Sequence, residues 1–200
     1  INAVRKALAT LLGADPVGSL PFTAPHGPMN DPMQMARSLA TLSLPLDEMR
    51  AVGKALDATL NDVAVTLVDE GVHRYLRDTD RGFPHRLVAF CPVSLRDDGD
   101  TEAGTKASAV FVHLGEPEVG VVERIDQVRS AMSAAKDEIR SMSKDAAMTY
   151  AVAILGAAEL TSATRVDRVT PPLANMVISN VPGRRERCYL NGAPLVGTFP

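Results

Sequence analysis

The sequence is poor in the residues that build several kinds of binding surface. Aromatic residues make up 4% of its 200 residues and tryptophan is absent, so a platform for stacking nucleic-acid bases is not predicted. The formal net charge is −3, whereas a protein that follows a phosphate backbone needs a clustered basic surface. We therefore expect no nucleic-acid partner.

Cysteine and histidine are also sparse. The two cysteines, Cys91 and Cys188, have no neighbouring ligand pattern, so neither a zinc site nor a disulfide framework is predicted. Both lie in apolar stretches, which indicates reduced, partly buried thiols in a cytoplasmic protein. No pair of histidines has metal-ligand spacing and none has the neighbours of a general base. The histidines are His26, His73, His85 and His113.

Long hydrophobic runs are missing as well. Hydrophobic residues make up 46% of the chain, enough for a sizeable core, yet no apolar run reaches the ~18 residues that cross a bilayer. The most apolar stretch, residues 146–160, is rich in alanine. We expect it to form a buried helix that is too short to span a membrane.

Breakers divide the chain into two parts. Residues 1–12 favour a short helix, and residues 13–32 contain five prolines, which exclude a long regular element. We expect residues 1–32 to be a helix followed by a Pro-rich inter-domain linker or arm, and residues 33–200 to be a half-domain. Because the chain starts without Met and stops just after a predicted strand, we expect this half-domain to be truncated at its C-terminus.

Hydrophobic periodicity predicts an α/β fold with a mixed β-sheet packed by helices. Strands are expected at residues 38–44, 86–92, 107–114 and 175–178, with a hairpin around Asn191-Gly192. Helices are expected at residues 46–56, 59–76, 121–142 and 146–160. In the second helix we expect an apolar stripe facing the core and the charged residues on the other side. The stripe comprises Leu60, Val63, Ala64, Leu67, Val68 and Val72, and the charged side includes Asp69 and Glu70.

Two short motifs carry possible chemistry, and each has a structural explanation. Thr59-x-x-Asp62 has the spacing of a capping box, so Asp62 and its neighbour Asn61 could simply start a helix. Residues 179–183, Ser-Asn-Val-Pro-Gly, end a hydrophobic strand and suit a type II turn with glycine at positive φ. Either motif alone indicates little about function.

Together, and at this separation, the motifs resemble the C-terminal half of the bacterial wax ester synthase/diacylglycerol acyltransferase family. The resemblance implies one half of a two-domain, coenzyme A-dependent acyltransferase fold. It also implies a partner: an N-terminal half that carries a His-His-x-x-x-Asp-Gly motif with the general base. That motif is absent from these residues, so we expect no catalytic residue in this chain.

The resemblance also assigns roles to individual residues. Residues expected to shape the active site or its tunnel are Asn61, Asp62, Ser179, Asn180, Pro182 and Gly183. Arg184 and Arg185 follow this turn and could bind coenzyme A phosphates, because guanidinium groups fit phosphate oxygens. A solvated hairpin explains the two arginines equally well. No metal is expected.

The function implied is long-chain acyl transfer from acyl-coenzyme A to diacylglycerol or to a long-chain alcohol. Acyl-coenzyme A would be a substrate, and no cofactor is expected. Since the acceptors reside in lipid, peripheral contact with the inner membrane or with lipid bodies is compatible with a cytoplasmic protein. Two alternatives stay open: a non-catalytic binding module of the same fold, and a condensation-type enzyme that takes acyl groups from a carrier protein.

Overall fold

The computed structural model describes residues 21–31, 35–79, 81–82, 85–94, 107–164, 170–181, 183 and 186–197. The helix expected at residues 1–12 lies outside this part of the chain. The elements are η1 (Pro28–Asn30), α2 (Leu46–Ala55), α3 (Leu60–Asp78), β1 (Val88–Ser94), β2 (Ala107–His113), α4 (Val121–Arg140), α5 (Lys144–Ala163), β3 (Met176–Val177), β4 (Tyr189–Leu190) and β5 (Ala193–Pro194).

The larger sheet is mixed, as the sequence predicts. Its strand order is β2-β1-β3. β1 pairs with β2 in antiparallel register from Val88–His113 to Ser94–Ala107, and with β3 in parallel register through Ala89–Met176. β4 and β5 form the predicted hairpin. Asn191 and Gly192 have φ values of 49° and 84°, as the tight Asn-Gly turn requires.

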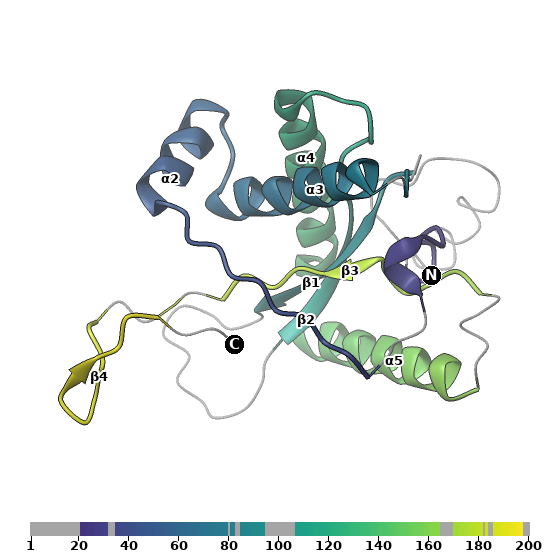
Figure 1. Ribbon diagram of the computed structural model, residues 1–200. Coiled ribbons are helices and arrows are strands. Elements are labelled where there is room, and N and C mark those ends of the chain that lie inside the picture. Colours follow the sequence, from purple (N-terminus) through teal and green to yellow (C-terminus); the bar gives the residue numbers. More distant parts are fainter. Residues whose placement is uncertain are drawn as a thin grey trace.

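Helices cover both faces of the mixed sheet, because successive side chains of a strand point to opposite faces. On one face, Ala89 and Cys91 of β1 pack against Val128 and Met132 of α4, together with residues of α3. On the other face, Val88 and Phe111 pack against Ile154 of α5. Figure 1 shows α3 above the strands, α4 running behind them and α5 below them. The predicted placement of residues 121–142 as a helix on a sheet is confirmed.

The Pro-rich arm lies against this sheet through one buried amide. Asn175 donates to Pro25 O at 2.8 Å and to Asn30 Oδ1 at 2.7 Å, and it accepts from Val88 N at 2.8 Å. Asn30 in turn donates to Ala174 O at 2.9 Å, and Ala24 is fully buried. Residues 21–31 are therefore attached to the body of the half-domain.

The strand expected at residues 38–44 is wrong. These residues form no regular element, and Leu39 and Leu42 are 80% and 82% exposed. A strand is stabilised by hydrogen bonds to a neighbouring strand, and no strand in the described residues pairs with this segment. The alternating pattern is present in the sequence, but the described residues contain no neighbouring strand that pairs with this segment.

The expected orientation of the 59–76 helix is only partly right: Val63 is buried and Val72 packs against the core, as expected, but other positions differ. α3 buries Val65 and Leu76 together with Asp69 and His73, whereas Leu67, which was expected to face the core, is 46% exposed. The helix has two sides that can be buried, and the buried side contains charged groups that pair with α4. Periodicity of apolar residues cannot detect a buried ion pair, because it treats every charged residue as solvent-facing.

α5 departs furthest from expectation. It is a helix, as predicted, but it extends over 20 residues and only Ala147 and Ile154 are buried. By length and composition it is long and apolar enough to cross a membrane, with a mean hydropathy of 1.3 over 18 residues. The expectation of a short, buried helix is wrong because α5 places one narrow side on the sheet and leaves its other apolar side exposed.

Candidate functional site

The first of the two motifs starts α3 with a complete capping box. Thr59 N donates to Asp62 Oδ2 at 2.9 Å, and Asp62 N donates to Thr59 Oγ1 at 3.2 Å. The Thr59 hydroxyl also donates to the same carboxylate oxygen at 2.7 Å. Asp62 is 4% exposed, so its carboxylate is held inside the protein by the backbone that it caps. This arrangement suits a structural role at the helix start.

The second motif lies beside the first. Asn180 Nδ2 donates to Asn61 Oδ1 at 3.3 Å across 119 residues of sequence. Parallel pairing of β3 with β1 brings this turn into place, since Ile178 N donates to Phe90 O at 3.0 Å just before it. The structure therefore brings together Asn61, Asp62 and the Ser179-Asn180 strand end. The side chains of Ser179 and Asn180 are exposed.

The remaining predicted site residues are only partly described. Pro182, Arg184 and Arg185 lie outside the described residues, so their predicted roles stay predictions. Gly183 is exposed with open space around it, and its φ is not in the left-handed region. The expectation of a type II turn with Gly183 at positive φ is therefore wrong.

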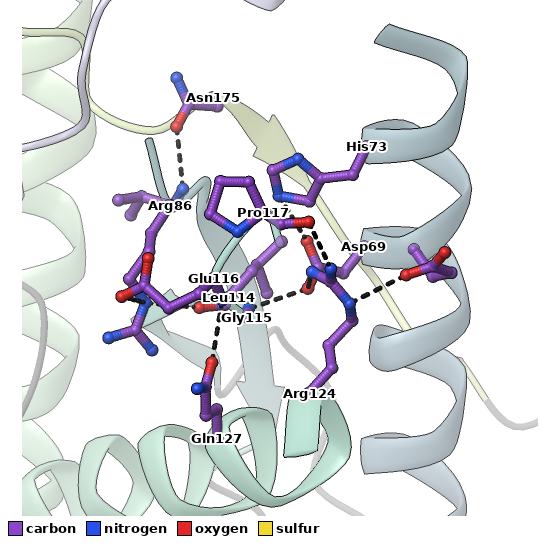
Figure 2. A network of polar contacts seen from close by, with 12 residues as sticks. Asp69, His73, Arg86, Leu114, Gly115, Glu116, Pro117, Arg124, Gln127 and Asn175 are labelled. Atoms are coloured by element: carbon purple, nitrogen blue, oxygen red, sulfur yellow. Dashed lines mark hydrogen bonds and ion pairs between the residues drawn. The ribbon is translucent and has the colours of Figure 1, made fainter. Parts of the chain in front are cut away.

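A buried ionic network was missed by the sequence reasoning (Figure 2). Arg124 of α4 and Asp69 of α3 are both fully buried and meet at 2.9 Å between Nη1 and Oδ2. The same carboxylate oxygen accepts from Gly115 N at 2.8 Å. Arg124 Nε also lies 3.0 Å from Glu70 Oε2. One guanidinium therefore holds α3, α4 and the β2–α4 loop together.

His73 extends this network by one helical turn. Its Nε2 lies 3.4 Å from Asp69 Oδ1 and the side chain is 3% exposed. Burial lowers the pKa of His73 below its ordinary value, although the negative charge of Asp69 opposes this shift. Burial raises the pKa of Asp69, against the hydrogen bonds from Arg124 and Gly115. His73 is therefore neutral at neutral pH and faces a carboxylate that is bound mainly by Arg124.

A sequence signal for this network exists. Asp69 and His73 are spaced as i and i+4, on the same side of α3 as Val65 and Leu76. A charged residue and a histidine on an apolar face indicate a buried pair when an arginine is available on a neighbouring helix. This criterion would have selected Asp69 but would not have identified Arg124 as its partner.

The described residues also contain a small cavity and lack a metal cluster. A cavity of about 240 Å³ is lined by Val93 and Ser94 at the end of β1 and by Lys136, Ile139 and Arg140 of α4. None of these residues was predicted as a site. No group of three or more metal-binding side chains comes together in this part of the chain.

Two family models match the chain. Residues 1–64 match the wax ester synthase/diacylglycerol acyltransferase catalytic domain, and residues 103–200 match the WS/DGAT C-terminal domain. Asn61 and Asp62 therefore lie in the first match, and Ser179 and Asn180 lie in the second. The hydrogen bond between Asn180 and Asn61 connects the two matched segments.

Individual relatives agree with these matches. The "Probable diacyglycerol O-acyltransferase Tgs4" of Mycobacterium tuberculosis is 37% identical over 179 residues, which are 89% of this chain and 38% of that protein. A Mycobacterium bovis protein whose name likewise designates a diacylglycerol O-acyltransferase is 38% identical over 191 residues, which are 36% of its length. The solved wax ester synthase/diacylglycerol acyltransferase from Marinobacter aquaeolei VT8 superimposes with a TM-score of 0.70 at 28% identity, over 98% of this chain and 43% of that one. The chain thus spans less than half the length of these relatives.

Proposed function

The chain belongs to the wax ester synthase/diacylglycerol acyltransferase family, and on this premise we propose that it is the second half of an O-acyltransferase. The reaction would move a long-chain fatty acyl group from acyl-coenzyme A to diacylglycerol or to a long-chain alcohol. The products would be a triacylglycerol or a wax ester, together with free coenzyme A. Acyl-coenzyme A is a substrate in this scheme, and no cofactor takes part.

The observation that carries the proposal is the contact between Asn180 and Asn61. The resemblance assigns both motifs to the active site, and the fold brings them within 3.3 Å although they are far apart in sequence. Parallel pairing of β3 with β1 carries the turn after β3 to the start of α3, so the two motifs meet although 119 residues separate them. Their meeting supports one site at the start of α3.

The chemistry divides between two halves. A histidine of the N-terminal half would take the proton from the acceptor hydroxyl as that oxygen attacks the thioester carbon. The C–S bond then breaks, and the thiolate of coenzyme A receives a proton. A base with a pKa near neutrality suits this step. The residues described here would orient the start of α3 and the turn after β3 around the acyl chain, and none of them would take part in the proton transfer.

Binding of the two substrates is part of the proposal. A long acyl chain would be held by alkyl side chains, since burying each CH₂ contributes about 0.8 kcal/mol. Arg184 and Arg185 would bind the phosphates of coenzyme A. Because the acceptors reside in lipid, the enzyme would work in the cytoplasm and make peripheral contact with the inner membrane or with lipid bodies.

The test uses the longer protein in which this chain follows its catalytic half. Palmitoyl-coenzyme A is supplied with dipalmitoylglycerol or with hexadecanol, and both the released thiol and the ester product are measured. We expect ester formation with at least one acceptor, and a loss of about tenfold in kcat/KM for Asn61→Ala or Asn180→Ala, or about 1.4 kcal/mol in the transition state. Ser133→Ala, an exposed change on α4, is the matched control and should retain full activity.

Two results would contradict the proposal. Binding of palmitoyl-coenzyme A without ester formation would favour the non-catalytic module of the same fold. Full activity of both asparagine variants would show that the contact between Asn180 and Asn61 is not part of the active site.

A further inference from the structure

α5 has two different sides. Its inner side packs on the sheet through Ala147 and Ile154, which are 1% and 7% exposed, and Ser108 Oγ donates to Ala147 O at 3.0 Å. Its outer side carries large apolar side chains that nothing covers in the described residues. We define this outer face of α5 by Met148, Val152, Leu155 and Leu160, which are 38%, 71%, 50% and 65% exposed.

The arrangement of these side chains indicates a contact surface. Met148, Val152 and Leu155 follow one another at spacings of four and three residues, so they form a stripe along the helix. Single exposed apolar residues are common, but a continuous apolar stripe on a soluble protein marks a place where another surface packs. Figure 1 shows α5 at the edge of the body, with no described element on its far side.

A lipid bilayer fits this face poorly. A spanning helix needs lipid around it, whereas the inner side of α5 packs on strand β2. A helix lying on a membrane surface usually carries several Lys or Arg residues on its polar side. α5 has Lys144 at its first position, and its other charged residues are Asp145 and Glu159. Attraction to anionic lipid headgroups is therefore weak.

We infer that the outer face of α5 is the surface on which the catalytic half of the same protein packs. The inference rests on the proposed function, because it needs that half to be present. This chain covers 38% and 43% of two relatives, so more than half of each relative has no counterpart here. Only residues 1–64 match the catalytic-domain model. The remainder of the catalytic domain is the occupant to which we commit, and the stripe of Met148, Val152 and Leu155, with a single charged residue, Glu159, one turn beyond it, suits a permanent interface.

The test measures alkylation of single cysteines in the longer protein. Val152→Cys reports on the outer face. Asp47→Cys is the exposed control, since the side chain of Asp47 is 96% exposed, and Ile154→Cys is the buried control at 7%. Rates with N-ethylmaleimide are read by peptide mass spectrometry and divided by the rate of the same cysteine in urea, so other cysteines and intrinsic reactivity do not affect the comparison.

We expect the cysteine at position 152 to react at least about tenfold more slowly than the one at position 47, close to the rate at position 154. Equal rates at positions 152 and 47 in buffer would overturn the inference. If the cysteine at 152 becomes protected only when phosphatidylcholine/phosphatidylglycerol vesicles are added, the occupant is a membrane. If its protection is lost on dilution from micromolar to nanomolar protein, the occupant is a second copy.

A second variant tests the interface without labelling. Val152→Asp should make limited proteolysis separate the two halves of the longer protein at least about fivefold faster, because it places a charge in an apolar contact. Asp47→Ala should leave the rate unchanged, and an unchanged rate in Val152→Asp would count against the inference. Neither readout requires turnover. A protein that is protected at position 152 but transfers no acyl group would therefore refute the proposed function and retain this interface.

Discussion

Asn180, in the turn after the edge strand β3, donates a hydrogen bond of 3.3 Å to Asn61 in the first turn of α3. The two residues belong to segments that match two different family models. The bond therefore lies at the joint between the end of the catalytic-domain match and the C-terminal domain. Both side chains are at least partly accessible. A molecule that binds beside this hydrogen bond would therefore contact the two amide groups.

A double-mutant cycle tests this contact. Asn61→Ala and Asn180→Ala should each lower the free energy of unfolding by less than about 1 kcal/mol, since the bond is solvent-exposed. The double variant should lose about 0.5 kcal/mol less than the sum of the two, which is the coupling of a shared hydrogen bond. Urea unfolding followed by circular dichroism provides the values. Strict additivity would show that the two amides do not interact.

Substitutions in the capping box at the start of α3 should lower the free energy of unfolding by more than the two asparagine substitutions do. Thr59→Ala or Asp62→Ala should each lower the free energy of unfolding by about 1–2 kcal/mol, because each change leaves free N–H groups at the start of α3. The matched control is Asp47→Ala in the first turn of α2, where the side chain is exposed, and it should cost less than about 0.5 kcal/mol. An Asp62→Ala variant as stable as the wild type would refute the capping role.

The buried pair of Asp69 and Arg124 predicts strong non-additivity. Arg124→Met alone should cost about 3–5 kcal/mol, because it leaves the buried Asp69 carboxylate uncompensated. Asp69→Asn should cost less, because Arg124 still pairs with the partly exposed Glu70. The double variant should be more stable than the sum of the two losses implies. Thermal or urea unfolding measures all three. Single losses below about 1 kcal/mol would mean that the pair is solvated.

Two glycines provide a matched test of close packing. At Gly115, an added Cβ would lie 2.5 Å from Arg124 Cγ and 3.0 Å from Asp69 Oδ2, so Gly115→Ala should cost about 1–3 kcal/mol. Gly71 lies inside α3 with nothing within 4 Å of such a Cβ. Gly71→Ala should therefore stabilise the protein by about 0.5–1 kcal/mol, because alanine favours a helix. Urea unfolding measures both changes in the free energy of unfolding, which should have opposite signs. Equal changes in the two variants would contradict the close packing at Gly115.

His73 predicts a dependence of stability on pH. Burial lowers its pKa below the ordinary 6.5 in the folded protein, against the attraction of Asp69 and Glu70 and together with the repulsion of Arg124 and Arg77. The unfolded chain therefore binds more protons below this pH. Above pH 6.5, His73 is neutral in both states and does not lower the free energy of unfolding. As the pH falls from the pKa of the unfolded state towards the lower pKa of the folded state, protonation of the unfolded chain reduces the stability.

The measurement compares wild type with His73→Gln. The wild-type stability should fall with decreasing pH by up to about 1.4 kcal/mol per pH unit in this window, and the variant should lack that component. The raised pKa of Asp69 makes stability change with pH in the opposite direction. The quantity to compare is therefore the difference in the free energy of unfolding between wild type and His73→Gln at each pH. Parallel curves between about pH 5 and pH 7.5 would show that His73 has an ordinary pKa.

Local signals predicted most of the elements but not their partners. Thr59-x-x-Asp62 predicted the cap of α3, and Asn191-Gly192 predicted the hairpin, because both depend on residues that are close in sequence. The alternating residues 38–44 failed as a strand, since pairing depends on a second segment. In the same way, the buried side of α3 was misassigned in part, because Asp69 is stabilised by Arg124, which is 55 residues away.

The sequence by itself determined the class of fold, the family and the residues of the two motifs, because propensity, turn chemistry and short motifs act over a few neighbouring residues. The tertiary structure decided that Asn180 meets Asn61, that Arg124 neutralises Asp69, and that α5 exposes one apolar face. These three outcomes depend on how strands pair and how helices lie on the sheet. That arrangement sets the surroundings of each side chain, and the surroundings determine whether a charge is buried and whether an apolar stripe is covered.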